Sequence, residues 1–109
     1  MNYTQNQKIS QVTEATLIVG VDIGSETNFA RAFNWRGQEL SKKVFHFRNS
    51  LEGFQSFLAY LNTYTTIASA RQVIVGCEPT GHYWFNLARY LEENNIKLAL
   101  VNPYHVKQI

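Results

Sequence analysis

The sequence predicts an α/β fold in which helices pack on a mixed five-stranded sheet. Three short runs rich in apolar residues, at 17–23, 72–77 and 97–101, are too short for helices and indicate buried strands. Amphipathic stretches precede the second and third runs, so the strands that they connect need crossovers and pair in parallel. We assign the polar residues 1–16 to a flexible N-terminal arm and residues 17–109 to one domain.

Two further strands follow the first run and complete an antiparallel meander. Residues 29–35 alternate large and small side chains at period two, which is typical of a sheet strand. After a turn around Gly37, residues 40–47 are expected to form a third strand. Its adjacent Lys42 and Lys43 suit a sheet edge that is protected by charge.

The amphipathic stretches predict two helices that cover the sheet. Ser50 can cap the first helix, and the residues on its apolar face are Phe54, Phe57, Leu58 and Leu61. Thr80 can cap the second helix, which ends near Asn94 and carries an apolar face of Trp84, Leu87, Ala88 and Leu91. This spacing favours packing against a core over ligand binding. A further helix is expected to begin at Tyr104.

The order of these elements predicts a sheet with strand order 3-2-1-4-5, which is the ribonuclease H-like layout. The first strand then lies at the centre, and the strand that ends at Glu78 lies directly beside it. Because parallel strands end at the same edge of a sheet, Asp22 and Glu78 are expected to meet there.

Asp22 is the anomaly of the first strand, because we expect that strand to be covered on both faces. A carboxylate in such a place is costly to desolvate unless a metal, a base or a phosphate-bound ion neutralises it. An equally weighted interpretation is that Asp22 only caps the following turn through its own backbone.

Two neighbouring carboxylates repel each other unless cations lie between them, and Mg²⁺ or Mn²⁺ fits such oxygen ligands. A pair of these ions can promote phosphodiester displacement, which usually requires three or four acids. The other six acidic residues fall in the arm, in turns or on solvated helix surfaces. The sequence therefore predicts half of a metal site.

Composition narrows the class of protein. A net charge of +2 and a pI near 8.8 permit a nucleic-acid partner without requiring one. Cys77 is the single cysteine and lies in an apolar run, so we expect a core residue and not a nucleophile. No leader and no 18-residue apolar run is present, which predicts a cytoplasmic protein with no membrane partner.

Three motifs together resemble a known family. They are Val19-Gly-Val-Asp-Ile-Gly-Ser25, Cys77-Glu-Pro-Thr-Gly-His-Tyr83 and Leu100-Val-Asn-Pro-Tyr-His-Val-Lys107. This combination resembles the N-terminal RuvC-like domain of DEDD insertion-sequence transposases, which also carry a C-terminal serine domain and work with a bridge RNA. The resemblance covers residues 17–109, and the Glu-x-Thr-Gly-x-Tyr motif with its later Val-Asn-Pro is the specific part.

The resemblance implies a metal-dependent enzyme that cleaves DNA and transfers its strands. Asp22 and Glu78 would be the first two acids of a catalytic tetrad, and Mg²⁺ or Mn²⁺ would bind only to the complete tetrad. The third and fourth acids follow the Val-Asn-Pro stretch in that family and are absent here, so we expect a truncated, inactive domain. DNA, a guide RNA and a second copy of the parent protein are the implied partners. Candidate nucleic-acid contacts are Ser25, Thr80, His82, Tyr83 and Lys107.

Two alternatives remain open. Gly20-Val-Asp-Ile-Gly-Ser25 also resembles the first phosphate loop of sugar kinases and actin-like ATPases, in which the aspartate holds magnesium beside ATP. That superfamily shares the ribonuclease H-like fold but has no need of an acid at Glu78. The other alternative is a non-enzymatic binding or dimerisation module in which both acids cap turns.

Overall fold

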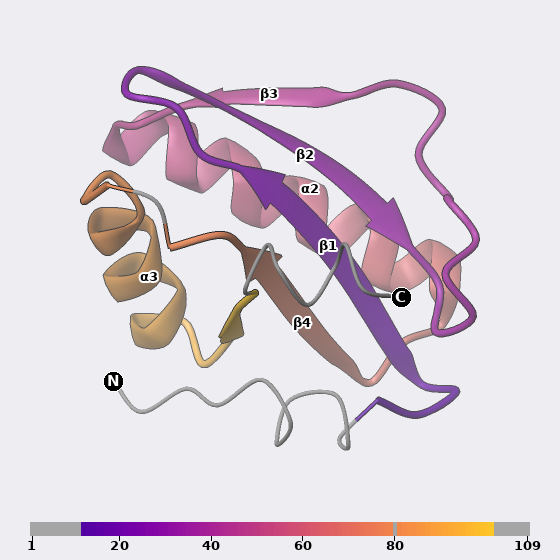
Figure 1. Ribbon diagram of the computed structural model, residues 1–109. Helices are drawn as coiled ribbons and strands as arrows, with labels where there is room; N and C mark the ends of the chain where they lie inside the picture. The colour runs from indigo at the N-terminus through magenta and orange to yellow at the C-terminus, as the bar shows by residue number, and fades with distance from the viewer. Residues whose placement is uncertain (1–11, 80, 102–109) are drawn as a thin grey trace.

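The computed structural model describes residues 12–79 and 81–101 and has two layers, a sheet and a pair of helices (Figure 1). The elements follow one another as β1 (Thr16–Asp22), β2 (Thr27–Phe33), β3 (Phe45–Arg48), α2 (Leu51–Ala68), β4 (Gln72–Cys77), α3 (Trp84–Glu93) and β5 (Lys97–Leu100). The sheet order is β3-β2-β1-β4-β5, with β1 antiparallel to β2 and parallel to β4. The expected mixed sheet with order 3-2-1-4-5 is thus confirmed.

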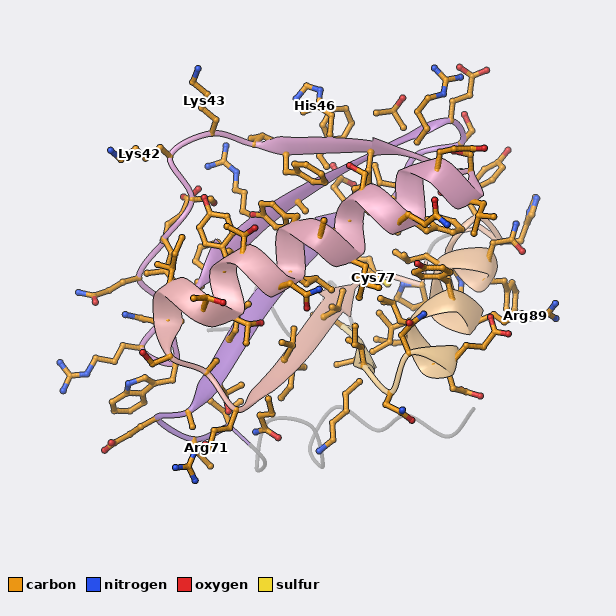
Figure 2. All side chains as sticks on the ribbon, turned by 180° about the vertical axis from the view of Figure 1, so that it is seen from behind. Lys42, Lys43, His46, Arg71, Cys77 and Arg89 are labelled. Atoms are coloured by element: carbon orange, nitrogen blue, oxygen red, sulfur yellow. The ribbon has the colours of Figure 1, made fainter. Side chains whose placement is uncertain are left out.

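Both helices lie on one face of the sheet. Figure 2, which views the molecule from behind, shows α2 and α3 in front of the strands. The core forms between these layers, where Val19 of β1 and Val75 of β4 contact the helix side and are fully buried. Aromatic rings strengthen the β3–α2 contact, since Phe47 and Phe57 stack with ring centroids 4.3 Å apart.

The helix predictions are confirmed in outline. The Ser50 hydroxyl accepts a hydrogen bond from Gly53 N at 3.1 Å and caps α2. Phe54, Phe57 and Leu61 are buried as expected, and Tyr60 is buried where Leu58 is only half-buried. On α3, Leu87, Ala88 and Leu91 are fully buried, whereas Trp84 is half-buried. The expected cap at Thr80 and the helix from Tyr104 lie outside the described residues.

The third strand is shorter than the sequence suggested. Glu39 forms an isolated bridge with Phe33, and Ser41 turns inward so that its hydroxyl accepts a hydrogen bond from Ala32 N at 3.1 Å. The chain then leaves the sheet at Lys42 and Lys43, which are exposed, and returns as β3. A regular strand would direct one of two adjacent lysines into the core, and this explains the break.

The expectation that β1 is covered on both faces is wrong for the part of the chain that the structure describes. Leu17, Val19 and Val21 point to the helices and are buried, whereas Gly20 and Asp22 on the other face are exposed. We call this second side the open face. The sequence did not indicate which face of β1 is exposed, because apolar residues lie on both faces of the strand.

Candidate active site at the open face of the sheet

Asp22 and Glu78 occupy equivalent positions at the ends of two adjacent parallel strands. Val21 pairs with Cys77 in the β1–β4 register, so the next residue of each chain segment is one of the acids. Asp22 is the last residue of β1, and Glu78 directly follows β4. The strand order therefore brings these two side chains to one edge, as the sequence predicted.

An open pocket with a volume of about 810 Å³ lies on the open face and includes both acids. Gly20 and Gly76, each two residues before one of the acids, are register partners and line the pocket without a side chain. We call these two residues the glycine floor. Phe29, which pairs with Asp22 across the antiparallel β1–β2 ladder, contributes to one side of the pocket.

The surroundings of Asp22 differ from those that we expected. Its carboxylate is exposed, and no residue in the described ranges donates a hydrogen bond to it or to Glu78. The desolvation argument made from the sequence is therefore wrong, because water reaches both carboxylates. Nor does Asp22 cap the turn that follows it, which is held by other side chains.

Two asparagines hold that turn, and we call them the asparagine clamp. Asn28 is fully buried, accepts a hydrogen bond from Gly24 N at 3.1 Å and donates one to Asn49 Oδ1 at 2.7 Å. Asn49 Nδ2 donates to the carbonyl oxygens of Gly24 at 2.7 Å and Ser25 at 3.1 Å. The clamp fixes the backbone immediately after Asp22, and it was missed in the sequence because a polar residue beside a turn is usually solvated.

The donor chemistry of the pair fits a hard divalent cation. Two exposed carboxylates offer oxygen ligands of the kind that Mg²⁺ and Mn²⁺ prefer, and the side-chain-free floor leaves room for water ligands. Within residues 12–79 and 81–101, no three His, Cys, Asp or Glu side chains come close enough together to form a complete metal centre. The two acids alone thus correspond to part of a site.

The other candidate residues do not join the pocket. Ser25 is exposed in the turn held by the clamp, and His82 and Tyr83 are exposed before α3 with ring centroids 4.5 Å apart. None of these three lines the pocket. Thr80 and Lys107 lie outside the described residues.

Cys77 is a core residue, as expected. Its side chain is buried, and burial raises the pKa of the thiol to about 11, with a further contribution from the neighbouring charge of Glu78. The thiol is therefore protonated at neutral pH and is not a nucleophile.

Solved structures confirm the fold. The chain is similar to a Bacteroides thetaiotaomicron protein with an actin-like ATPase fold (TM-score 0.55, 15% identity, 90% of this chain and 37% of that one). It is also similar to a foamy viral protease–reverse transcriptase in complex with double-stranded DNA (0.51, 14%, 82% and 20%) and to Archaeoglobus fulgidus Pelota (0.50, 17%, 89% and 29%). The chain thus spans about a fifth to two fifths of these proteins, and the likeness concerns the fold alone.

Comparison of the amino-acid sequence with protein families, in contrast to the comparison of folds, identifies the family of the chain. No curated protein sequence matches the chain. None of the helices that the structure describes is long and apolar enough to cross a membrane. The model of a family described as transposase, of the DEDD, IS110 type, matches residues 19–109, which include both acids and nearly the whole domain. The chain therefore belongs to this transposase family.

Proposed function

We propose that this protein is a metal-dependent DNA transposase that cleaves and transfers the strands of an insertion sequence. One observation carries the proposal: Asp22 and Glu78 lie at equivalent positions on adjacent parallel strands and line one pocket on the open face. Membership of the transposase family supports the same assignment. A phosphate loop of the kinase type has no role for Glu78 in this position.

In this proposal, Asp22 and Glu78 hold divalent metal ions, Mg²⁺ or Mn²⁺. When bound, such ions would supply positive charge that stabilises the oxygens on which negative charge develops during phosphodiester displacement. The chain contributes the two carboxylates, the clamp that fixes the backbone after Asp22, and the glycine floor, over which a nucleic-acid backbone can approach closely.

Further acids complete the site in this proposal. All eight acidic residues of the chain lie in the described ranges, and only Asp22 and Glu78 line the pocket. Two carboxylates leave most of an octahedral shell to water, which Mg²⁺ retains strongly. We therefore expect weak metal binding and no DNA cleavage by these 109 residues alone. By family resemblance, a guide RNA and a second copy of the protein are partners, and the cytoplasm of a prokaryotic cell is the site of action.

The decisive experiment measures Mn²⁺-dependent DNA cleavage and strand transfer by the complete transposase that carries this chain. Asp22→Asn and Glu78→Gln should each lower the rate by about 10²-fold or more, because charge that develops in the transition state loses its stabilisation. Glu26→Gln is the matched control, since Glu26 is exposed in the adjacent turn and outside the pocket. Unchanged cleavage by Asp22→Asn, or ATP binding that depends on Asp22, would overturn the proposal.

A further inference from the structure

A row of four side chains crosses the open face from the acids to the β3 edge. Val21 of β1 pairs with Cys77 of β4, so the residues that follow them, Asp22 and Glu78, lie side by side. On the other side of Asp22, Phe29 of β2 is its register partner, and Phe29 in turn pairs with His46 of β3. We call Glu78, Asp22, Phe29 and His46 the open-face row. Because neighbouring strands lie about 4.8 Å apart, the row is roughly 14 Å long.

Phe29 is the unusual member of the row. It is a large apolar side chain with 40% of its surface exposed, in the middle of a strand and directly beside Asp22. Its ring contacts His46 edge-on, with ring centroids 5.0 Å apart and an angle of 70° between the planes. This contact orients the ring without burying it.

Cationic side chains flank Phe29 along the open face. Arg48 pairs with Thr27, two residues before Phe29, and its side chain is exposed on the same side as His46. Arg31 lies two residues after Phe29 and pairs with Glu39 at 3.0 Å, so its charge is partly neutralised. Figure 2 shows His46 pointing away from α2 at the β3 edge. Arg48 therefore places a positive charge beside the His46 end of the row.

The alternation of acid, aromatic and cationic groups matches one strand of a nucleic acid. A phosphate can approach the acids only through bound cations, and a base can stack on Phe29. The next phosphate is then attracted by the charge of Arg48 and can accept a hydrogen bond from His46. An apolar protein partner would match Phe29 but would leave the adjacent charges of Asp22 and Arg48 unpaired.

We propose that Phe29, His46 and Arg48 form a binding subsite for single-stranded DNA beside the two acids. Phe29 stacks the base next to the phosphate at Asp22 and Glu78, and His46 and Arg48 bind the following phosphate. The position of the stacked base relative to the reacting phosphate rests on the proposed function. The binding of single-stranded DNA to Phe29, His46 and Arg48 does not.

The test measures the affinity of the complete protein for a short single-stranded DNA whose terminal, unphosphorylated nucleoside carries 2-aminopurine. Divalent metal is left out, and the missing terminal phosphate means that no phosphate has to lie against the two acids without a cation. Phe29→Ala should weaken binding by about 5- to 150-fold and abolish quenching of the fluorescent base, as expected for the loss of one stacked base. Phe29→Tyr should restore both signals, whereas Phe29→Leu keeps an apolar side chain and should not. Arg48→Ala should reduce the salt dependence of binding by about 0.7 in log–log slope.

Trp35→Ala is the matched control. Trp35 is also 40% exposed and has the Arg36 guanidinium 5.1 Å from its ring centroid, but it lies in the turn after β2 and outside the row. Equal weakening by Trp35→Ala, or full affinity of Phe29→Leu, would overturn the subsite. A tenfold preference for RNA, or Phe29-dependent binding to a protein only, would overturn its assignment to DNA. Asp22→Asn should retain quenching of the fluorescent base, because Asp22 does not contact that base. The binding assay therefore tests the subsite, and the cleavage assay with Asp22→Asn tests the catalytic proposal separately.

Discussion

Replacement of Asn28 by alanine tests whether the asparagine clamp fixes the turn that follows the first acid. Asn28 is a fully buried polar side chain at the start of β2, and its amide connects Gly24 N with Asn49 Oδ1. Asn49 in turn donates to two carbonyl oxygens of the same turn. Loss of Asn28 therefore removes two hydrogen bonds and leaves both of its partners without one.

The magnitude follows from these two orphaned groups. An unsatisfied buried polar group destabilises a fold by about 1–3 kcal/mol. Gly24 and Asn49 are half-buried, so water replaces part of the loss, and we expect Asn28→Ala to lower the free energy of unfolding by about 2–4 kcal/mol. For a domain of this size, that corresponds to a decrease of about 10–30 °C in Tm.

Urea unfolding of Asn28→Ala, Asn49→Ala and the double variant measures the effect and the coupling between the two side chains. Asn34→Ala is the matched control, because Asn34 also makes three side-chain hydrogen bonds, but in an exposed turn. It should lower the free energy of unfolding by no more than about 1 kcal/mol. Equal effects of Asn28→Ala and Asn34→Ala, or additive effects in the Asn28/Asn49 cycle, would refute the clamp.

Three further predictions concern stability. Gly53→Ala should destabilise by about 1–3 kcal/mol although alanine favours helices, because a Cβ there would collide with the Arg48 carbonyl oxygen; equal or higher stability would contradict this packing. Burial raises the pKa of the Cys77 thiol to about 11, against an ordinary 9.0, so the folded state holds this proton more tightly than the unfolded state does. About 2–3 kcal/mol of the free energy of unfolding is therefore lost as the pH rises from 9 through 11. Urea titrations of Cys77→Ala should lack this part of the pH dependence. Tyr60→Phe should keep or raise Tm, since the buried Tyr60 hydroxyl has no hydrogen-bond partner among the described residues; a large decrease would reveal one.

The strand order and the position of both acids could be predicted because they follow from strong local signals. Short apolar runs separated by amphipathic stretches define parallel crossovers, and the handedness of those crossovers places β4 beside β1. Asp22 and Glu78 then lie at adjacent strand ends, and this placement does not depend on their surroundings. Ser50 was predictable for a similar reason, since a cap acts within its own turn.

The environment of the acids could not be predicted, because burial depends on which face the helices cover. Residues 17–21 contain apolar side chains on both faces of β1, and period two assigns residues to faces without saying which face is open. Phe29 was consequently interpreted only as a strand residue. Asn28 was missed because its partner Asn49 is 21 residues away, and only the folded chain brings the two amides together.

The fold itself does not require glycine at the two positions of the glycine floor. A Cβ on Gly20 would come no closer than 4.0 Å to Phe33 Cε2, and one on Gly76 no closer than 3.6 Å to Val101 Cγ2, both ordinary contacts. Glycine inside a strand is less stable than alanine by about 0.5–1 kcal/mol, so these two positions destabilise a fold that does not need them. Gly20→Ala and Gly76→Ala should therefore each raise the free energy of unfolding by about that amount while weakening DNA binding. If either variant were stabilised and its affinity for DNA unchanged, no nucleic-acid backbone would approach the sheet closely at Gly20 and Gly76.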